Sequence, residues 1–110
     1  MPYNESLADR IREALAHRSE LTEKKMFGGL SFMLGGHMCC GVVRDDLVVR
    51  VGPDGYDEAL GRPHARPMDF TGRPLKGMVY VGIEGLGRDE QLEFWLEQAL
   101  SFVLSLPPKP

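Results

Sequence analysis

Cysteine is scarce in this chain, and the only two, Cys39 and Cys40, are adjacent. Neighbouring residues on a strand point to opposite faces, so a disulfide between these two would need a strained backbone. The sequence also contains no paired Cys-x-x-Cys and no His-Glu-x-x-His pattern, which are two common zinc motifs. We therefore expect two reduced thiols in a reducing compartment, and no metal or other cofactor.

Long apolar runs are absent as well. No stretch approaches the roughly 18 apolar residues that a membrane helix needs. The N-terminus is polar and acidic from Asn4 onward and has no apolar signal region. The sequence therefore predicts a cytoplasmic protein with no membrane partner.

The charge balance is close to neutral, because the net charge of the 110 residues is −3. A general attraction to nucleic acid or to an acidic membrane is not indicated by that value. Hydrophobic residues make up 43% and charged residues 26%, which is ordinary for a globular protein. The length fits one domain, which we place at residues 3–106, followed by a frayed tail at 107–110.

Two apolar periodicities predict helices. The first helix should run from Asn4 or Glu5 to His17, with Asn4 as its N-cap. The second should begin near Asp89 and end before Pro107-Pro108. Their apolar positions recur at intervals of three and four, at residues 7, 8, 11, 14 and 15 and at residues 92, 95, 96, 99, 102, 103 and 106. A short helix is also expected over Tyr56–Leu60, with Asp54 as a possible cap and Gly61 as its end.

Residues 25–34 and 37–51 should form strands, and Met78 to Ile83 another. A two-residue turn at Asp45-Asp46 would pair Val43 with Val48 and Val42 with Val49. Cys40, Val42, Val49 and Val51 would then share one face of the sheet, and His37, Cys39, Val43, Val48 and Arg50 the other. The proline-rich segment from Arg62 to Lys76 should be mostly loop, with an extended piece near residues 68–70.

This order of elements predicts an α+β fold. Hairpin connections imply an antiparallel sheet of about four to five strands. We expect it to form two layers with the N- and C-terminal helices.

Catalytic chemistry finds little support. His37 and Cys39 are two apart on one expected strand and could form a thiolate–imidazolium pair. Strand cysteines more commonly pack as small apolar groups, and no third group or oxyanion hole is evident. His37 and Cys39 are weak metal candidates that would need His64 or a second chain. We predict no catalytic residues and no enzyme.

The segment Lys24-Lys25-Met26-Phe27-Gly28-Gly29 separates a helical from a strand-like region. It lacks the Gly-Lys-Ser/Thr ending of a phosphate-binding loop and leads into a strand. Gly28 and Gly29 are therefore predicted to form a structural turn. Five methionines could form a soft groove, although such residues more often fill a core: Met26, Met33, Met38, Met68 and Met78.

Basic residues are concentrated in one segment. Between residues 62 and 76 there are four cations and one acid, Asp69; the cations are Arg62, Arg66, Arg73 and Lys76. Aromatic residues lie nearby in the sequence, so the segment could contact nucleic acid weakly and in a salt-dependent way. The alternative is a proline-rich loop whose arginines pair with the acidic last helix.

Five sequence segments together resemble the N-terminal domain of the TfoX/Sxy family of bacterial competence regulators. The segments, in order, are Lys25-Met26-Phe27-Gly28-Gly29, Cys40-Gly41-Val42-Val43, Leu47-Val48-Val49-Arg50, Arg66-Pro67-Met68-Asp69-Phe70 and Pro74-Leu75-Lys76-Gly77-Met78. The resemblance runs from about Leu7 to Leu106. It implies an α+β domain, a bacterial cytoplasmic setting and a role in transcription regulation beside a DNA-bound activator. Full-length regulators of this type carry a second, helical domain, and the resemblance supplies no catalytic residues.

We accordingly expect a non-enzymatic regulatory domain that acts through protein–protein contacts, with a transcription factor as the foremost candidate partner. The candidate contact residues for a protein or nucleic acid are Lys25, Phe27, Arg62, Arg66, Arg73 and Lys76. Two alternatives stay open. One is weak direct nucleic-acid binding through the basic 62–76 loop, and the other is a small-molecule or metal sensor at the face of His37, Cys39 and Arg50.

Overall fold

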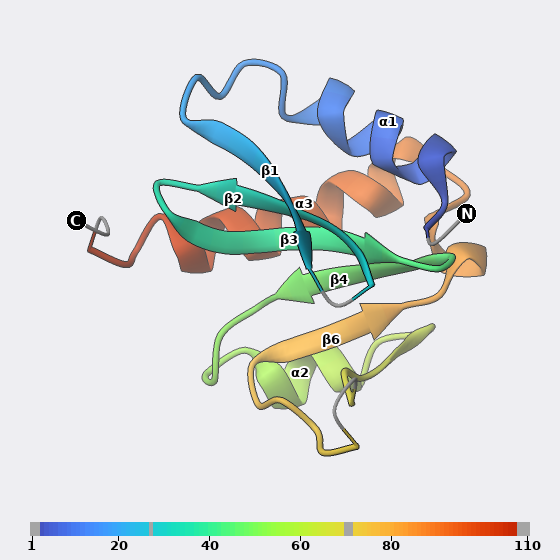
Figure 1. The fold of residues 1–110 in the computed structure, drawn as a ribbon. Coiled ribbons are helices and arrows are strands. Elements are labelled where there is room, and N and C mark those ends of the chain that lie inside the picture. The colour runs from blue at the N-terminus through green and yellow to red at the C-terminus, as the bar shows by residue number, and fades with distance from the viewer. Residues whose placement is uncertain (1–2, 27, 70–71, 108–110) are drawn as a thin grey trace.

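A computed structural model of the chain describes residues 3–26, 28–69 and 72–107 (Figure 1). They form a six-stranded antiparallel sheet, in the order β1-β2-β3-β4-β6-β5, with three α-helices. The helices are α1 (Glu5–Ala14), α2 (Tyr56–Leu60) and α3 (Asp89–Val103), with a 3-10 helix η1 (Ile83–Leu86) before α3. The strands are β1 (Leu21–Met26), β2 (Gly29–Leu34), β3 (His37–Val43), β4 (Asp46–Arg50), β5 (Ala65–Pro67) and β6 (Met78–Val81). The predicted α+β class is confirmed, with six strands in place of four to five.

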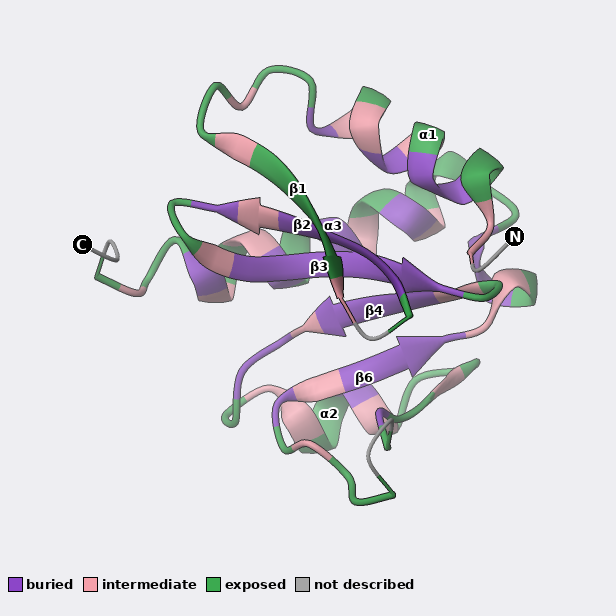
Figure 2. Ribbon diagram, viewed as in Figure 1, coloured by how far each residue is buried: buried purple, intermediate pink, exposed green. Residues whose placement is uncertain are grey.

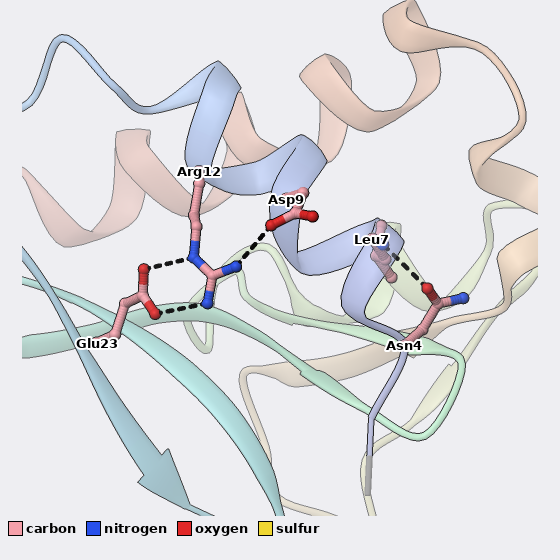
Figure 3. Close-up of polar contacts among 5 residues, drawn as sticks. All are labelled: Asn4, Leu7, Asp9, Arg12 and Glu23. Carbon is pink, nitrogen blue, oxygen red and sulfur yellow. Dashed lines mark hydrogen bonds and ion pairs between the residues drawn. The ribbon is translucent and has the colours of Figure 1, made fainter. Parts of the chain in front are cut away.

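The two long helices follow their apolar periodicities. In α1 the side chain of Asn4 accepts a hydrogen bond from the Leu7 amide at 3.0 Å, which caps the first turn (Figure 3). This helix ends at Ala14, three residues before the predicted end at His17. Helix α3 begins at Asp89, as expected, and buries one stripe of side chains: Leu92, Trp95, Leu96, Ala99 and Val103. None of the described helices has the length and apolar content that crossing a membrane requires.

The core lies between the sheet and the helices. Helix α1 packs on β3, α3 on β3 and β4, and α2 on β5 and β6. A second, smaller cluster of buried side chains is separate from this core and contains Met38, Val43, Val48, Met68 and Tyr80. The central strands are therefore buried almost throughout, as the purple ribbon in Figure 2 shows.

Strand β1 was missed as an independent element, because the prediction began one strand at residue 25. Its sequence, Leu21 to Met26, has four exposed residues between two half-buried ends. It lies at the edge of the sheet, where one side of the ladder has no partner strand among the described residues (Figure 2). An edge strand of this kind needs no apolar alternation, so periodicity could not detect it.

A bidentate ion pair ties β1 to α1. The Arg12 guanidinium donates from Nε to Glu23 Oε2 at 2.7 Å and from Nη2 to Glu23 Oε1 at 2.8 Å (Figure 3). Its third nitrogen, Nη1, donates to Asp9 at 2.7 Å. The hydrogen bonds from Arg12 lower the pKa of Glu23, and they outweigh the opposing effect of burial. Within the described chain the backbone of β1 pairs only with β2, so this ion pair is a second contact that holds β1 in place.

The β3–β4 hairpin has a different register from the predicted one. Val42 pairs with Leu47 and Val43 with Asp46, so the two-residue turn is Arg44-Asp45. Arg44 adopts a positive φ of 53°, which the sequence did not signal. The shift is two residues, so the side chains keep their predicted faces. Val42 and Val49 still point to the helices, and Val43 and Val48 to the opposite side.

A β-bulge in β3 changes the faces of the residues before Cys40. Phe32 pairs with Cys40 and Met33 pairs with Met38, so Cys39 is the extra residue. The bulge places Cys39 with Cys40 in the helix-facing core, and Met38 in the opposite cluster. The prediction that adjacent Cys39 and Cys40 face opposite sides was therefore wrong, because strict alternation stops at the bulge.

The second half of the sheet shows smaller corrections. Strand β5 covers Ala65–Pro67, earlier than the extended piece expected near residues 68–70, of which residue 70 lies outside the described part. Strand β6 ends at Val81, before the predicted end at Ile83, because the 3-10 helix η1 begins at Ile83. Helix α2 has the predicted bounds and ends at Gly61, but Gly55 precedes it and Asp54 does not cap it.

Strands β2 and β3 approach too closely for side chains at two positions. A β-carbon at Gly29 would lie 2.0 Å from the Val42 carbonyl oxygen. A β-carbon at Gly41 would lie 2.6 Å from the Leu30 carbonyl oxygen. Gly28, just before β2, has a φ of 73° with open space around it. The two residues of the glycine pair thus have different reasons to be glycine: Gly28 for its backbone angle and Gly29 for its contact.

Gly29→Ala should destabilise the domain by at least about 2–3 kcal/mol, because the clash is with backbone that cannot rotate away. Gly87→Ala is the matched control: Gly87 has a φ of −65°, and a β-carbon there would meet no other atom within 4 Å. The control should change the free energy of unfolding by less than about 0.5 kcal/mol. Urea denaturation of both variants checks this, and equal stabilities would contradict the close approach.

Glu23→Gln should lower stability at neutral pH by well under 1 kcal/mol, because both partners are about one-third exposed. Since the folded-state pKa of Glu23 is lowered, its contribution is present above the unfolded value and is lost as pH falls through the folded value. The difference from the parent chain should therefore shrink between pH 7 and pH 3. Glu13→Gln, on the exposed side of α1, serves as control. A difference that does not change with pH would contradict the ion pair.

Candidate functional site

Two of the predicted basic residues are held against aromatic rings. The guanidinium carbon of Arg62 lies 3.9 Å from the centroid of Phe94, on α3. That of Arg66 lies 5.0 Å from the centroid of Tyr80, and Arg66 also forms an ion pair with Asp46 on β4. The proposed pairing of these arginines with acids of the last helix is not what the structure shows. Arg62 contacts the Phe94 ring of that helix, and Arg66 pairs with Asp46 of the sheet.

The remaining contact candidates lie elsewhere. Lys25 is exposed on β1, and Arg73 and Lys76 are exposed in the loop before β6. Phe27 lies outside the described residues. Of the four basic loop residues, Arg62 lines one cavity and Lys76 lines another. The 62–76 segment therefore does not present its cations around a single hollow.

The cavity at Lys76, which we call the methionine groove, is the strongest candidate site. Its volume is about 290 Å³. It is lined by the end of β1 and the loop before β6, together with β3, β4 and the end of α3, through Met26, Met38, Arg50, Gly52, Pro53, Leu75, Lys76, Gly77, Met78 and Phe102. Of the predicted contact residues that the structure describes, Lys76 lines this groove, whereas Lys25 does not.

Arg50 is the polar centre of the methionine groove. Its Nη1 donates to the Met38 carbonyl oxygen at 3.3 Å. Its guanidinium carbon lies 5.3 Å from the centroid of Phe102. Phe102 packs so closely on Gly52 that a β-carbon there would lie 2.3 Å from the ring, and Gly52 has a φ of 83°. Phe102 can thus form the groove wall only because residue 52 is a glycine. The Arg50 guanidinium is held by the Met38 carbonyl oxygen and by the Phe102 ring.

The methionines contribute to both the groove and the core. Met26, Met38 and Met78 line the groove. Met68 is completely buried, and Met33 packs beside it in the smaller cluster. Both interpretations thus apply, and they overlap, because Met38 belongs to the buried cluster and Met78 packs against it while both also line the groove. Methionine side chains are flexible and polarisable, so this groove wall can adapt to apolar groups of different shape.

The two thiols are buried away from any described surface. Cys39 and Cys40 are both 0% exposed. A thiol hydrogen bond from Cys40 lowers the pKa of Cys39, with smaller help from the charges of Arg18 and Arg50. The same hydrogen bond and burial raise the pKa of Cys40. Cys39 carries the more acidic thiol, but it lies inside the core.

The face predicted for a sensor is also rearranged. His37 Nε2 lies 2.6 Å from the Pro107 carbonyl oxygen, at the end of the described chain. Cys39 points into the core because of the bulge, so it does not share an accessible face with His37 and Arg50. Within residues 3–26, 28–69 and 72–107, no three His, Cys, Asp or Glu side chains are grouped to hold a metal ion.

Two large apolar residues of the groove were not identified as site residues from the sequence. Leu75 and Phe102 were assigned to a loop and to the apolar face of the last helix. Phe102 is half-buried and packs on Gly52 in the segment after β4, a contact that periodicity alone could not show. The glycine at position 52 was a usable signal, because a close contact at a strand end often needs glycine.

The fold and the groove together define a small α+β domain with an apolar, positively charged hollow on its surface. Comparison with known families then gives the identity: the TfoX N-terminal domain family matches residues 13–103, and the chain belongs to that family. The match begins within α1 and ends at the last residue of α3. Searches of curated proteins and of solved structures give no significant match to this chain.

Proposed function

We propose that this domain is a non-enzymatic regulatory module that acts through protein–protein contacts. In this proposal the methionine groove holds an apolar segment of a partner protein, flanked by an acidic residue. The observation that carries the proposal is the lining itself, in which three methionines, Leu75 and Phe102 surround the cations Arg50 and Lys76. Family membership supports a regulatory setting, with a transcription factor as the partner we would seek first.

The size of the groove favours side-chain anchors over an enclosed substrate. A volume of about 290 Å³ lies at the lower limit of small-molecule sites, and the hollow is open to the surface. One or two apolar side chains of a partner could enter it. Buried apolar anchors of this kind usually carry most of the affinity of an interface.

Charge gives the groove its preference for acidic partners. Among the described residues, Arg50 and Lys76 are the only ionisable side chains that line it, and both are positive. Lys24 is exposed on β1, two residues before Met26 and therefore on the same face of that strand. A carboxylate beside the apolar anchor would meet these cations, which would orient the segment and speed its association.

Segments far apart in the sequence build this surface. Three of the five segments that resemble the family contribute to it, namely those at 25–29, 47–50 and 74–78. Antiparallel pairing of β4 with β6 brings Arg50 directly beside Met78. A common surface for these segments is the arrangement expected when they act together on one partner.

Lys76→Glu should reduce capture of a specific partner from the native host by about three- to tenfold, because it reverses a charge at the rim of the groove. Lys76 is exposed, so the fold should be unaffected. Arg73→Glu makes the same charge change three residues earlier, outside the groove, and should leave capture unchanged. Quantitative mass spectrometry of the captured proteins is the measurement.

Two outcomes would contradict the proposal. In one, no protein is enriched by the parent chain above a tag-only control. In the other, Lys76→Glu and Arg73→Glu reduce capture equally, which would show a general charge effect instead of a groove. Circular dichroism of each variant ensures that a loss of capture is not a loss of fold.

A further inference from the structure

A second cavity lies at the other end of α3, beside its first turns. Its volume is about 300 Å³. It is bounded by the loop after α2, by η1 and by α3, and it is lined by Arg62, Pro63, His64, Gly85, Arg88, Glu90, Gln91, Phe94 and Trp95. On α3 this cavity is lined by residues from Glu90 to Trp95 and the methionine groove by Phe102, so the two are about 10–18 Å apart along the helix.

Two arginines of this cavity have no acidic partner within the described part of the chain. There, ion pairs are formed by Arg10, Arg12 and Arg66, but not by Arg62 or Arg88. Glu90 also lines the cavity without forming an ion pair there. The two guanidinium groups therefore exceed the one carboxylate, and each keeps N–H groups free for a ligand.

The orientation of Arg62 is fixed by an aromatic ring. Its guanidinium carbon lies 3.9 Å from the centroid of Phe94, so the group lies against the ring face. Phe94 is itself held edge-to-face against Trp95, with 5.2 Å between the ring centroids. A stacked guanidinium presents its donors from the edge, which is the geometry that a carboxylate or phosphate accepts.

The cavity wall also contains a strained residue. His64 has a φ of 68°, in the left-handed region that residues other than glycine rarely adopt. Its carbonyl oxygen accepts a hydrogen bond from the Gly82 amide at 3.0 Å. Its side chain packs so closely on Gly85 that a β-carbon there would lie 2.8 Å from it. Conformations of this kind cluster at active sites, ligand clamps and switch regions, where the surroundings hold them in place.

From these observations we propose that the cavity binds a small ligand through an oxyanion, either a phosphate or a carboxylate. Arg62 and Arg88 donate to the oxyanion, and Phe94 with Trp95 supplies the apolar wall for the rest of the ligand. His64 forms the part of the cavity wall beside Gly85. This site is separate from the methionine groove and does not depend on the partner proposed for it.

The test is a titration of the full chain, followed by two-dimensional amide NMR, with inorganic phosphate and, separately, with acetate. Chloride keeps the ionic strength constant in both series. Saturable shifts should occur at the amides of Gly85, Arg88 and Gln91. Tighter binding of phosphate would assign a phosphate ligand, and tighter binding of acetate a carboxylate ligand.

The variants Arg88→Gln and Arg62→Gln/Arg88→Gln connect the shifts to the cavity. The double variant should bind the better anion at least about tenfold more weakly, because both charge-assisted donors are lost. Arg88→Gln alone should weaken binding less, and it should leave the fold unchanged because the Arg88 side chain is exposed. Arg73→Gln, a loop arginine outside the cavity, should bind like the parent chain.

The proposal would be overturned if neither anion gives saturable shifts at these amides. It would also be overturned if Arg73→Gln weakens binding as much as the double variant, since that would indicate a general effect of positive charge. The amide spectra of the variants report directly whether each remains folded.

Discussion

A β-bulge at Cys39 decides which side chains of β3 enter the helix-facing core and which line the methionine groove. One extra residue in β3 reverses the alternation before Cys40, so both cysteines enter the helix-facing core while Met38 moves to the other face. There Met38 lines the methionine groove, and its carbonyl oxygen accepts the hydrogen bond from Arg50. Without the bulge the core would contain a methionine in place of a thiol, and the groove would lose part of its wall.

Features with strong local signals could be predicted from the sequence. The apolar stripes of α1 and α3 and the Asn4 cap are local, and the faces of Val42 and Val49 depend only on whether the register is odd or even. The register of the β3–β4 hairpin could not be predicted, because it depends on Arg44 adopting a positive φ. Strand β1 is polar and lies at an edge, so its place is set by pairing with β2 and by the Arg12–Glu23 contact.

The candidate sites were less predictable than the fold, because each is assembled from distant segments. The basic 62–76 segment suggested one charged surface, but the loop returns to the sheet at β5 and places Arg62 and Lys76 at different cavities. Helix α3 links the two, since its first turns line one cavity and Phe102 near its end lines the other. A sequence pattern can identify the cations, but only the order β4-β6-β5 shows which of them lie together.

Met26, Met38 and Met78 line the groove, and Met38 does so from the buried cluster that it shares with Met68. We propose that these three methionines form an adaptable binding surface. The most direct measurement labels the methionine methyl groups with carbon-13 and follows their NMR signals during titration with a short leucine-rich peptide flanked by aspartates. We predict saturable shifts for Met26, Met38 and Met78, and an almost unchanged signal for the fully buried Met68. Shifts absent from all three groove methionines, or equally large at Met68, would show that the peptide does not bind in the groove.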